Sequence, residues 1–178
     1  MRSAANDVQF THVRFFDTAT LDLESTGGGT IAYKEMPDGQ VIYAAALCSM
    51  SDNFSKSRGR VISTGRLIAF KEKLDAGLTL PAADEYGLRA VVGTKNGCYL
   101  PLQGTFSILD VTSAADTNDE HDIRDALSSN MSLILNKLLE QQFEKETGMP
   151  ATQYGFEAYG LVTAPVHAVR REPEVYRM

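Results

Sequence analysis

The hydrophobic pattern in the first third of the chain is typical of β-strands. Residues 8–16 are rich in β-branched and aromatic side chains, and residues 30–36 and 40–47 are apolar segments on either side of a Pro-Asp-Gly sequence at 37–39. Proline presets one backbone dihedral of a turn and glycine permits a positive φ, so we predict a β-hairpin here. Because residues 40–47 are almost continuously apolar, we expect a central strand that is covered on both faces.

A first helix is predicted over residues 56–75, where apolar side chains recur at helical spacing. We expect Asp52 or Asn53 to cap its start and Gly77 to end it. The side chains predicted to lie on the sheet are Val61, Ile62, Ile68, Ala69 and Phe54.

Glycines in this region indicate special backbone environments. Gly59 and Gly65 each cost the predicted helix about 1 kcal/mol relative to alanine. We therefore expect the helix backbone to come close to a strand, a second subunit or a ligand at these positions. The three glycines at 27–29 indicate a flexible loop or a bulge, because they lack the lysine and the following helix of a phosphate-binding loop.

A second, longer helix is predicted over residues 119–147, followed by the helix-ending residues Gly148 and Pro150. Its apolar residues recur every three or four positions and form one stripe. The members of this stripe are Ile123, Leu127, Met131, Ile134, Leu135, Leu138 and Phe143.

Further strands are predicted at 86–93, 98–102, 105–111 and 160–169. An Asn-Gly turn at 94–97 joins the first two, and Pro165 makes the last one an edge strand. Together these elements predict an α+β fold with a mainly antiparallel sheet and two principal helices packed on one of its faces. We expect a single domain over residues 1–170 and a polar C-terminal tail at 171–178.

The composition is that of an ordinary globular protein, with 43% apolar and 22% charged residues in a chain of 178. Cys48 and Cys98 are far apart and form no metal-binding spacing, which favours free thiols in a reducing compartment. The first residues lack the apolar core of a signal peptide, and no apolar run reaches the ~20 residues that span a bilayer. We therefore expect a cytoplasmic protein without a membrane partner.

Charge is distributed unevenly along the chain. The net charge is −6, yet residues 53–71, hereafter the basic segment, contain five basic residues and no acid. The rest of the chain therefore sums to −11. A basic segment at a helix start, with its free backbone amides and positive dipole end, predicts a site for an anion such as phosphate. The expected phosphate-binding residues are Ser55, Lys56, Arg58, Arg60 and Arg66; the alternative is a solvated helix face.

No complete catalytic signature is present, so we favour a binding protein over an enzyme. The three histidines lack metal-binding spacing, and we expect neither a metal nor a cofactor. Cys48 stands beside a predicted helix start, which lowers a thiol pKa, but the apolar run before it favours a buried thiol. Tyr43, Phe54 and Tyr99 are candidates for stacking on a nucleotide base, with core packing as the alternative.

Residues 52–67 have the form DxFSKxxGRxxAxGRL, with Ser63 where an alanine is usual. This run resembles a pattern found in small uncharacterised bacteriophage accessory proteins, and the resemblance covers only this part of the chain. It implies a phage origin and expression in the host bacterial cytoplasm. It supplies no catalytic residues. Phage accessory proteins of this size often counter host defences or act on host nucleic-acid machinery.

These observations suggest an anti-defence protein that binds a phosphate-bearing ligand, such as a nucleotide or a cyclic nucleotide signal. One alternative is a DNA- or RNA-binding protein that uses the same basic helix. Another is an inhibitor of a host nucleic-acid-binding protein, with an acidic surface formed by residues 116–122 and 140–146. We also expect a homo-oligomer, because both predicted helices have faces available for packing.

Overall fold

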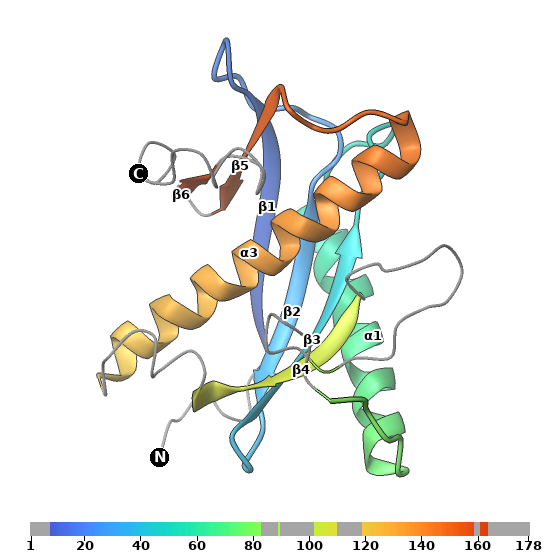
Figure 1. The fold of residues 1–178 in the computed structure, drawn as a ribbon, viewed down its shortest axis with the longest axis vertical. Coiled ribbons are helices and arrows are strands. Elements are labelled where there is room, and N and C mark those ends of the chain that lie inside the picture. Colours follow the sequence, from blue (N-terminus) through green and yellow to red (C-terminus); the bar gives the residue numbers. More distant parts are fainter. Residues whose placement is uncertain (1–7, 83–88, 90–101, 110–118, 159–160, 164–178) are drawn as a thin grey trace.

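The computed structural model describes residues 8–82, 89, 102–109, 119–158 and 161–163, and it has an α+β fold (Figure 1). The hairpin, both helices and the first strand occur where the sequence predicts them. In chain order the elements are β1 (Gln9–Asp17), β2 (Gly29–Glu35), β3 (Gln40–Leu47), α1 (Lys56–Asp75), β4 (Gln103–Ser107), α3 (Glu120–Thr147), β5 (Tyr154–Ala158) and β6 (Leu161–Thr163).

The described strands form one antiparallel sheet in the order β4-β3-β2-β1-β5-β6. Gly39, in the turn between β2 and β3, has a φ of 85°. The predicted turn relied on glycine because glycine permits such a positive φ. Strand β3 lies inside the sheet, and its residues from Val41 to Ala46 are buried. The prediction that this strand is covered on both faces is confirmed.

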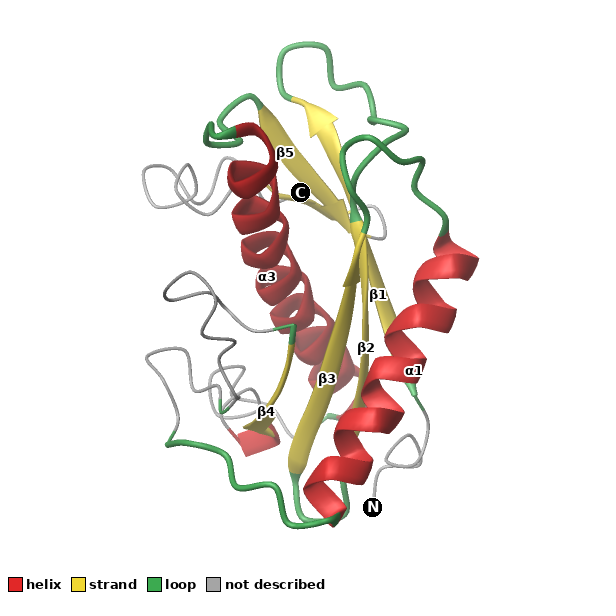
Figure 2. Ribbon diagram, turned by 90° about the vertical axis from the view of Figure 1, so that its right-hand side faces the viewer, coloured by secondary structure: helices red, strands yellow, loops and turns green. Residues whose placement is uncertain are grey.

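The two helices lie on opposite faces of the sheet (Figure 2), so the expectation that both cover one face was wrong. Successive strand residues point to alternate faces. Ile31 and Tyr43 pack in the larger core on the α3 side, whereas Ala32 and Ile42 pack against α1. Because β2 and β3 have apolar residues on both faces of the sheet, each face must be shielded from water by another element.

Helix α1 has the predicted bounds but buries a different face. Its buried residues are Ser63, Leu67 and Phe70, whereas Val61 and Ile68 of the predicted stripe are 74% and 53% exposed. The reason lies in the small residues of the first two turns. A Cβ on Gly59 would run into the side chain of Thr30, so only glycine lets α1 lie this close to β2. The predicted close approach of the helix to a strand is therefore confirmed at Gly59, whereas no atom of the described residues lies within 4 Å of the position that a Cβ on Gly65 would take.

Helix α3 buries the predicted stripe against β1, β2 and β3. Near its C-terminal end, four aromatic rings meet with centroids 5.1–6.0 Å apart, a spacing at which ring pairs stabilise a core beyond their area alone. The rings belong to Phe15, Phe143, Tyr154 and Phe156. This core fixes the half of the sheet that lies away from α1.

The remaining strand predictions have mixed outcomes. The hairpin predicted over 86–102 lies outside the described residues except for Arg89, which bridges to Thr105, and Leu102. Strand β4 begins two residues before the predicted 105–111 segment and ends at Ser107, where the backbone turns into a helical conformation. Strand β5 was not predicted. Its residues alternate between glycine and aromatic side chains, and the last strand was predicted to begin only at residue 160. Strand β6 falls within the predicted 160–169 segment and is last in the described sheet order.

Candidate functional site

The start of α1 is held in place by the segment that leads into it. The amide of Phe54 donates to the carbonyl of Ser25 at 2.9 Å, and the amide of Gly27 donates to the carbonyl of Asp52 at 3.2 Å. Gly27 and Gly28 have φ values of 75° and 87°, and a Cβ on Gly28 would crowd the carbonyl oxygen of Val13. The glycine run is therefore a fixed bend beside the helix start.

Ser55, rather than Asp52 or Asn53, is the N-cap of α1. Its Oγ accepts a hydrogen bond from the amide of Arg58 at 3.3 Å, with the extended backbone that is usual for a cap. The carbonyl of Asp52 is already engaged with Gly27, and Asn53 bridges to Thr26, so both residues belong to the preceding loop. The predicted site residue Ser55 thus has a structural role at the helix start.

The four predicted cations do not converge on one point. Lys56 and Arg60, four residues apart, lie on the side of α1 that faces β1, close enough to His12 for their charges to affect it. Arg58 lies on the other side, beside Cys48. Arg66 donates from Nη1 to the carbonyl of Ala45 at 2.8 Å and so anchors α1 to β3.

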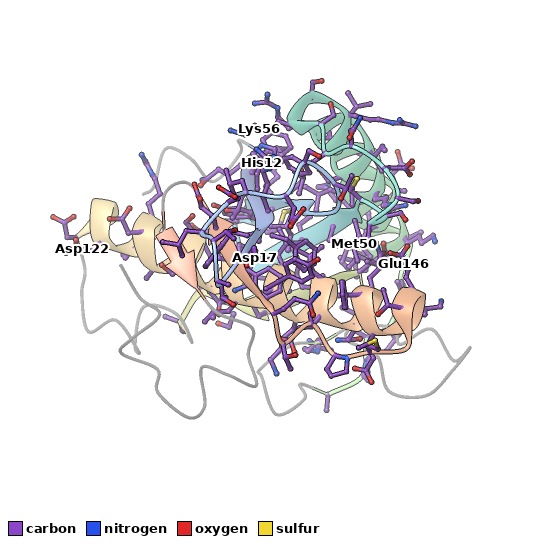
Figure 3. All side chains as sticks on the ribbon, turned by 90° about the horizontal axis from the view of Figure 1, so that it is seen from above. His12, Asp17, Met50, Lys56, Asp122 and Glu146 are labelled. Atoms are coloured by element: carbon purple, nitrogen blue, oxygen red, sulfur yellow. The ribbon has the colours of Figure 1, made fainter. Side chains whose placement is uncertain are left out.

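His12 is the buried residue beneath the first pair of cations, and Figure 3 shows it next to Lys56. Its Nδ1 shares a hydrogen bond of 2.8 Å with the hydroxyl of Thr30. Burial, together with the positive charges of Arg60 and Lys56, lowers the pKa of His12 from the usual 6.5 to about 4. The imidazole is therefore neutral at physiological pH. It adds no positive charge to the surface formed by Lys56 and Arg60.

Phe54 links His12 to a further cation that the sequence reasoning missed. Its ring meets the His12 ring edge-on at 6.2 Å between centroids, and the guanidinium of Arg14 lies 5.7 Å from the Phe54 centroid. Arg14 also donates to the carbonyl of Glu24 at 2.8 Å. The signal in the sequence was the alternation of β1, because Phe10, His12 and Arg14 are two residues apart. Glu157 lies opposite Arg14 in the sheet register, on the neighbouring strand β5.

The other side of the helix start forms a small pocket of about 160 Å³. Asp52 and Arg58 both line it, so its charge is balanced and it suits an anion less well than the side with Lys56 and Arg60. Cys48 also lines this pocket, and its Sγ donates to the carbonyl of Asp52 at 3.4 Å. Burial raises the pKa of the half-buried Cys48 thiol, which removes any basis for a reactive thiolate at neutral pH.

The three predicted stacking residues have different outcomes. Tyr43 was a wrong prediction, because its ring is fully buried in the core on the α3 side and has no surface for a base. Tyr99 lies outside the described residues. Phe54 is half-buried and beside the cations, with Arg14 already over its ring. The site is therefore a basic surface bordered by one partly covered aromatic ring.

Within the described ranges, no group of three or more His, Cys, Asp and Glu residues is arranged to hold a metal ion. Nor does any helix in the described part of the chain combine the length and apolar character needed to cross a bilayer. Comparison with protein-family models, curated proteins and solved structures gave no match.

Proposed function

We propose that the β1-facing side of the start of α1 binds the phosphate group of a nucleotide-like ligand. Lys56 and Arg60, together with the helix start, form the binding surface, hereafter the phosphate surface. The observation behind the proposal is that both side chains are exposed and that neither has a carboxylate within ion-pair distance among the described residues. Two neighbouring cations without a counter-charge leave a local positive potential in an acidic protein.

Three features support phosphate as the anion. The first turn of α1 contains no acidic residue, so the positive end of the helix dipole is not neutralised there. Arginine forms paired hydrogen bonds to phosphate oxygens, and lysine adds a point charge. Neutral His12 lies beneath these cations, where an approaching phosphate would stabilise its protonated form.

The resemblance of residues 52–67 to phage accessory proteins suggests a role for such binding. A protein of this kind that captures a nucleotide or cyclic nucleotide signal of the host would lower its free concentration and weaken the defence that depends on it. Binding alone accounts for this effect, so the proposed role needs no catalytic residue.

The test is a thermal-shift screen of the purified chain against mononucleotides, cyclic nucleotides, cyclic oligonucleotides and short DNA and RNA. A ligand at about 100 times its dissociation constant adds about 2.7 kcal/mol to the stability of the folded state. We expect one nucleotide class to raise the melting temperature of the parent chain. The Lys56→Ala/Arg60→Ala variant should lose this shift.

The matched control is Lys71→Ala/Lys73→Ala, which removes the same charge from the other end of the same helix. It should keep the ligand-induced shift. A screen without any shift would refute the proposed function, and so would a shift that both variants keep. A steep decrease of affinity with salt for DNA or RNA, without any response to nucleotides, would instead favour the nucleic-acid-binding alternative.

NMR of His12 gives an independent readout of where the anion binds. Phosphate beside Lys56 and Arg60 offsets part of the positive charge that lowers the His12 pKa, so that pKa should rise when ligand is added. A bound ligand that leaves the His12 titration unchanged would bind elsewhere on the protein.

A further inference from the structure

Helix α1 has apolar side chains on the face that points away from the sheet. Val61 and Ile68 are 74% and 53% exposed, and a Cβ on Gly65, between them, would have no atom of the described residues within 4 Å. Figure 2 shows α1 as the outermost layer on its side of the sheet, with no other described element covering it. We call Val61, Gly65, Ile68 and Glu72 the outer face of α1, together with Arg58, which is exposed in the same line of the helix although its side chain also borders the pocket beside Cys48.

The outer face is symmetric about Gly65. Arg58 precedes Gly65 by seven residues and Glu72 follows it by seven, which is about two helical turns in each direction. All three residues therefore lie in one line along the helix. Val61 and Ile68 lie between the glycine and the two charges. Neither Arg58 nor Glu72 has an ion-pair partner among the described residues.

A helix with a basic end, an apolar middle and an acidic end on one face is complementary to a second copy of itself running in the opposite direction. We propose that the chain forms a homodimer in which two α1 helices pack antiparallel about a two-fold axis at Gly65. Each Arg58 then faces Glu72 of the partner subunit, and this pair occurs twice. Val61 lies near Ile68 of the partner subunit, and glycine at the crossing lets the two backbones approach.

The physical terms have different roles in this interface. Burial of the exposed valine and isoleucine provides the attraction, and an isologous contact doubles every favourable pair. The exposed charge pairs contribute little energy each, but they select the antiparallel register, because a parallel pair would place like charges together. One pair of helices is a small interface, so we expect a dimer that dissociates on dilution.

The proposed dimer goes beyond the phosphate surface and does not depend on it. Lys56 and Arg60 lie on the side of α1 that faces β1, so the antiparallel pairing leaves them accessible in both subunits. Glu72 is four turns away from the helix start. Variants at Glu72 and Gly65 therefore test the dimer without changing the phosphate surface.

Sedimentation velocity of the full chain over a range of concentrations, with charge reversals, tests the pairing. Glu72→Arg alone and Arg58→Glu alone each place like charges together twice, and each should weaken dimerisation about tenfold. The Arg58→Glu/Glu72→Arg variant restores opposite charges with exchanged positions and should dimerise like the parent. The control Lys73→Glu changes charge outside the outer face and should have no effect.

Cross-linking tests the location of the axis. Gly65→Cys places two thiols at the two-fold axis, where oxidation should join the subunits rapidly. Ser57→Cys, on the same helix but far from the axis, should cross-link no faster than the parent with its native cysteines. A chain that stays monomeric at all concentrations would overturn the proposal. A dimer whose strength is unchanged by both charge reversals would also overturn it. Equal cross-linking at positions 57 and 65 would do the same.

Discussion

Thr30 is a residue at which the sheet comes very close to helix α1. Its hydroxyl is hydrogen bonded to His12, and its side chain occupies the space in which any Cβ on residue 59 would have to lie. Gly59 and Gly65 look equivalent in the sequence, since both interrupt the same helix. Their surroundings differ, because no described residue occupies the space next to Gly65.

Alanine substitutions at the two glycines should therefore change the free energy of unfolding in opposite directions. Gly59→Ala should lower the free energy of unfolding by about 1–3 kcal/mol, because the added methyl group collides with Thr30. Gly65→Ala should raise it by up to about 1 kcal/mol, because alanine favours the helix and meets none of the described residues. Denaturant unfolding of both variants at a protein concentration that keeps the chain monomeric measures the difference. Equal effects of the two substitutions would contradict the close approach of α1 to β2.

His12 predicts a pH dependence of stability. Its pKa is about 4 in the folded protein, below the 6.5 of an unperturbed imidazole, so the unfolded chain binds more protons between these values. The contribution of neutral His12 is complete above about pH 6.5 and is lost as the pH falls towards 4.

Unfolding free energies measured across this pH range should decrease with falling pH in the parent chain. The decrease should be smaller in His12→Gln, which cannot be protonated. The two proteins differ only at position 12, so the difference between the two curves isolates the contribution of the histidine. Parallel curves would show that His12 is protonated as readily in the folded as in the unfolded state.

Arg66 illustrates a site residue whose role the sequence could not identify. A run of basic residues gives no indication of which side chain reaches a backbone carbonyl and which remains in solvent. The bond from Arg66 to Ala45 depends on the crossing of α1 over β3, which is a tertiary feature. Arg66→Ala should therefore cost about 1 kcal/mol of stability in denaturant unfolding and leave ligand binding unchanged. Loss of ligand binding with unchanged stability would instead show that Arg66 binds the ligand.

At the level of elements, the bounds of both helices could be predicted from the apolar spacing and from helix-ending residues, which are local signals, whereas the N-cap of α1 is Ser55 and not the predicted Asp52 or Asn53. The buried face of α1 could not. The apolar residues Val61 and Ile68 suggested one stripe, whereas Gly59 and Ser63 allow the helix to lie on the sheet along another. Small residues that permit contact carry no hydrophobic signal. In α3 the buried stripe is made of large apolar residues, so periodicity alone identified it.

Helix α3 offers a direct measure of this burial. Leu135 is fully buried in the core, whereas Leu133, two residues earlier, is 38% exposed. Leu135→Ala should lower the free energy of unfolding by about 2–5 kcal/mol, because it leaves a cavity between the helix and the sheet. Leu133→Ala removes the same atoms and should cost much less. Thermal or denaturant unfolding compares them, and similar losses would mean that the helix packs through another face.

At the scale of the whole molecule, the sequence predicted the α+β fold but not the distribution of the helices. The apolar residues of β2 and β3 occur at both alternations, which already requires cover on both faces of the sheet. We therefore expected residues 40–47 to be covered on both faces, but we did not infer that the two helices lie on opposite faces. The position of His12 beneath Lys56 and Arg60 depends on the same arrangement. It joins residues from β1 and α1 that no sequence spacing relates.

The two sides of the sheet differ greatly in the amount of apolar packing. The cluster on the α3 side includes residues from most of the described strands, whereas α1 is held mainly by Leu67, Phe70 and a few residues of β2 and β3. Proteins open in cooperative units whose free energies follow such differences. We expect the amides of α1 to exchange with deuterium before those of α3, as a unit that opens while the rest stays folded. A ligand on α1 would then slow exchange along that whole helix, and the exchange rates would report occupancy of the phosphate surface.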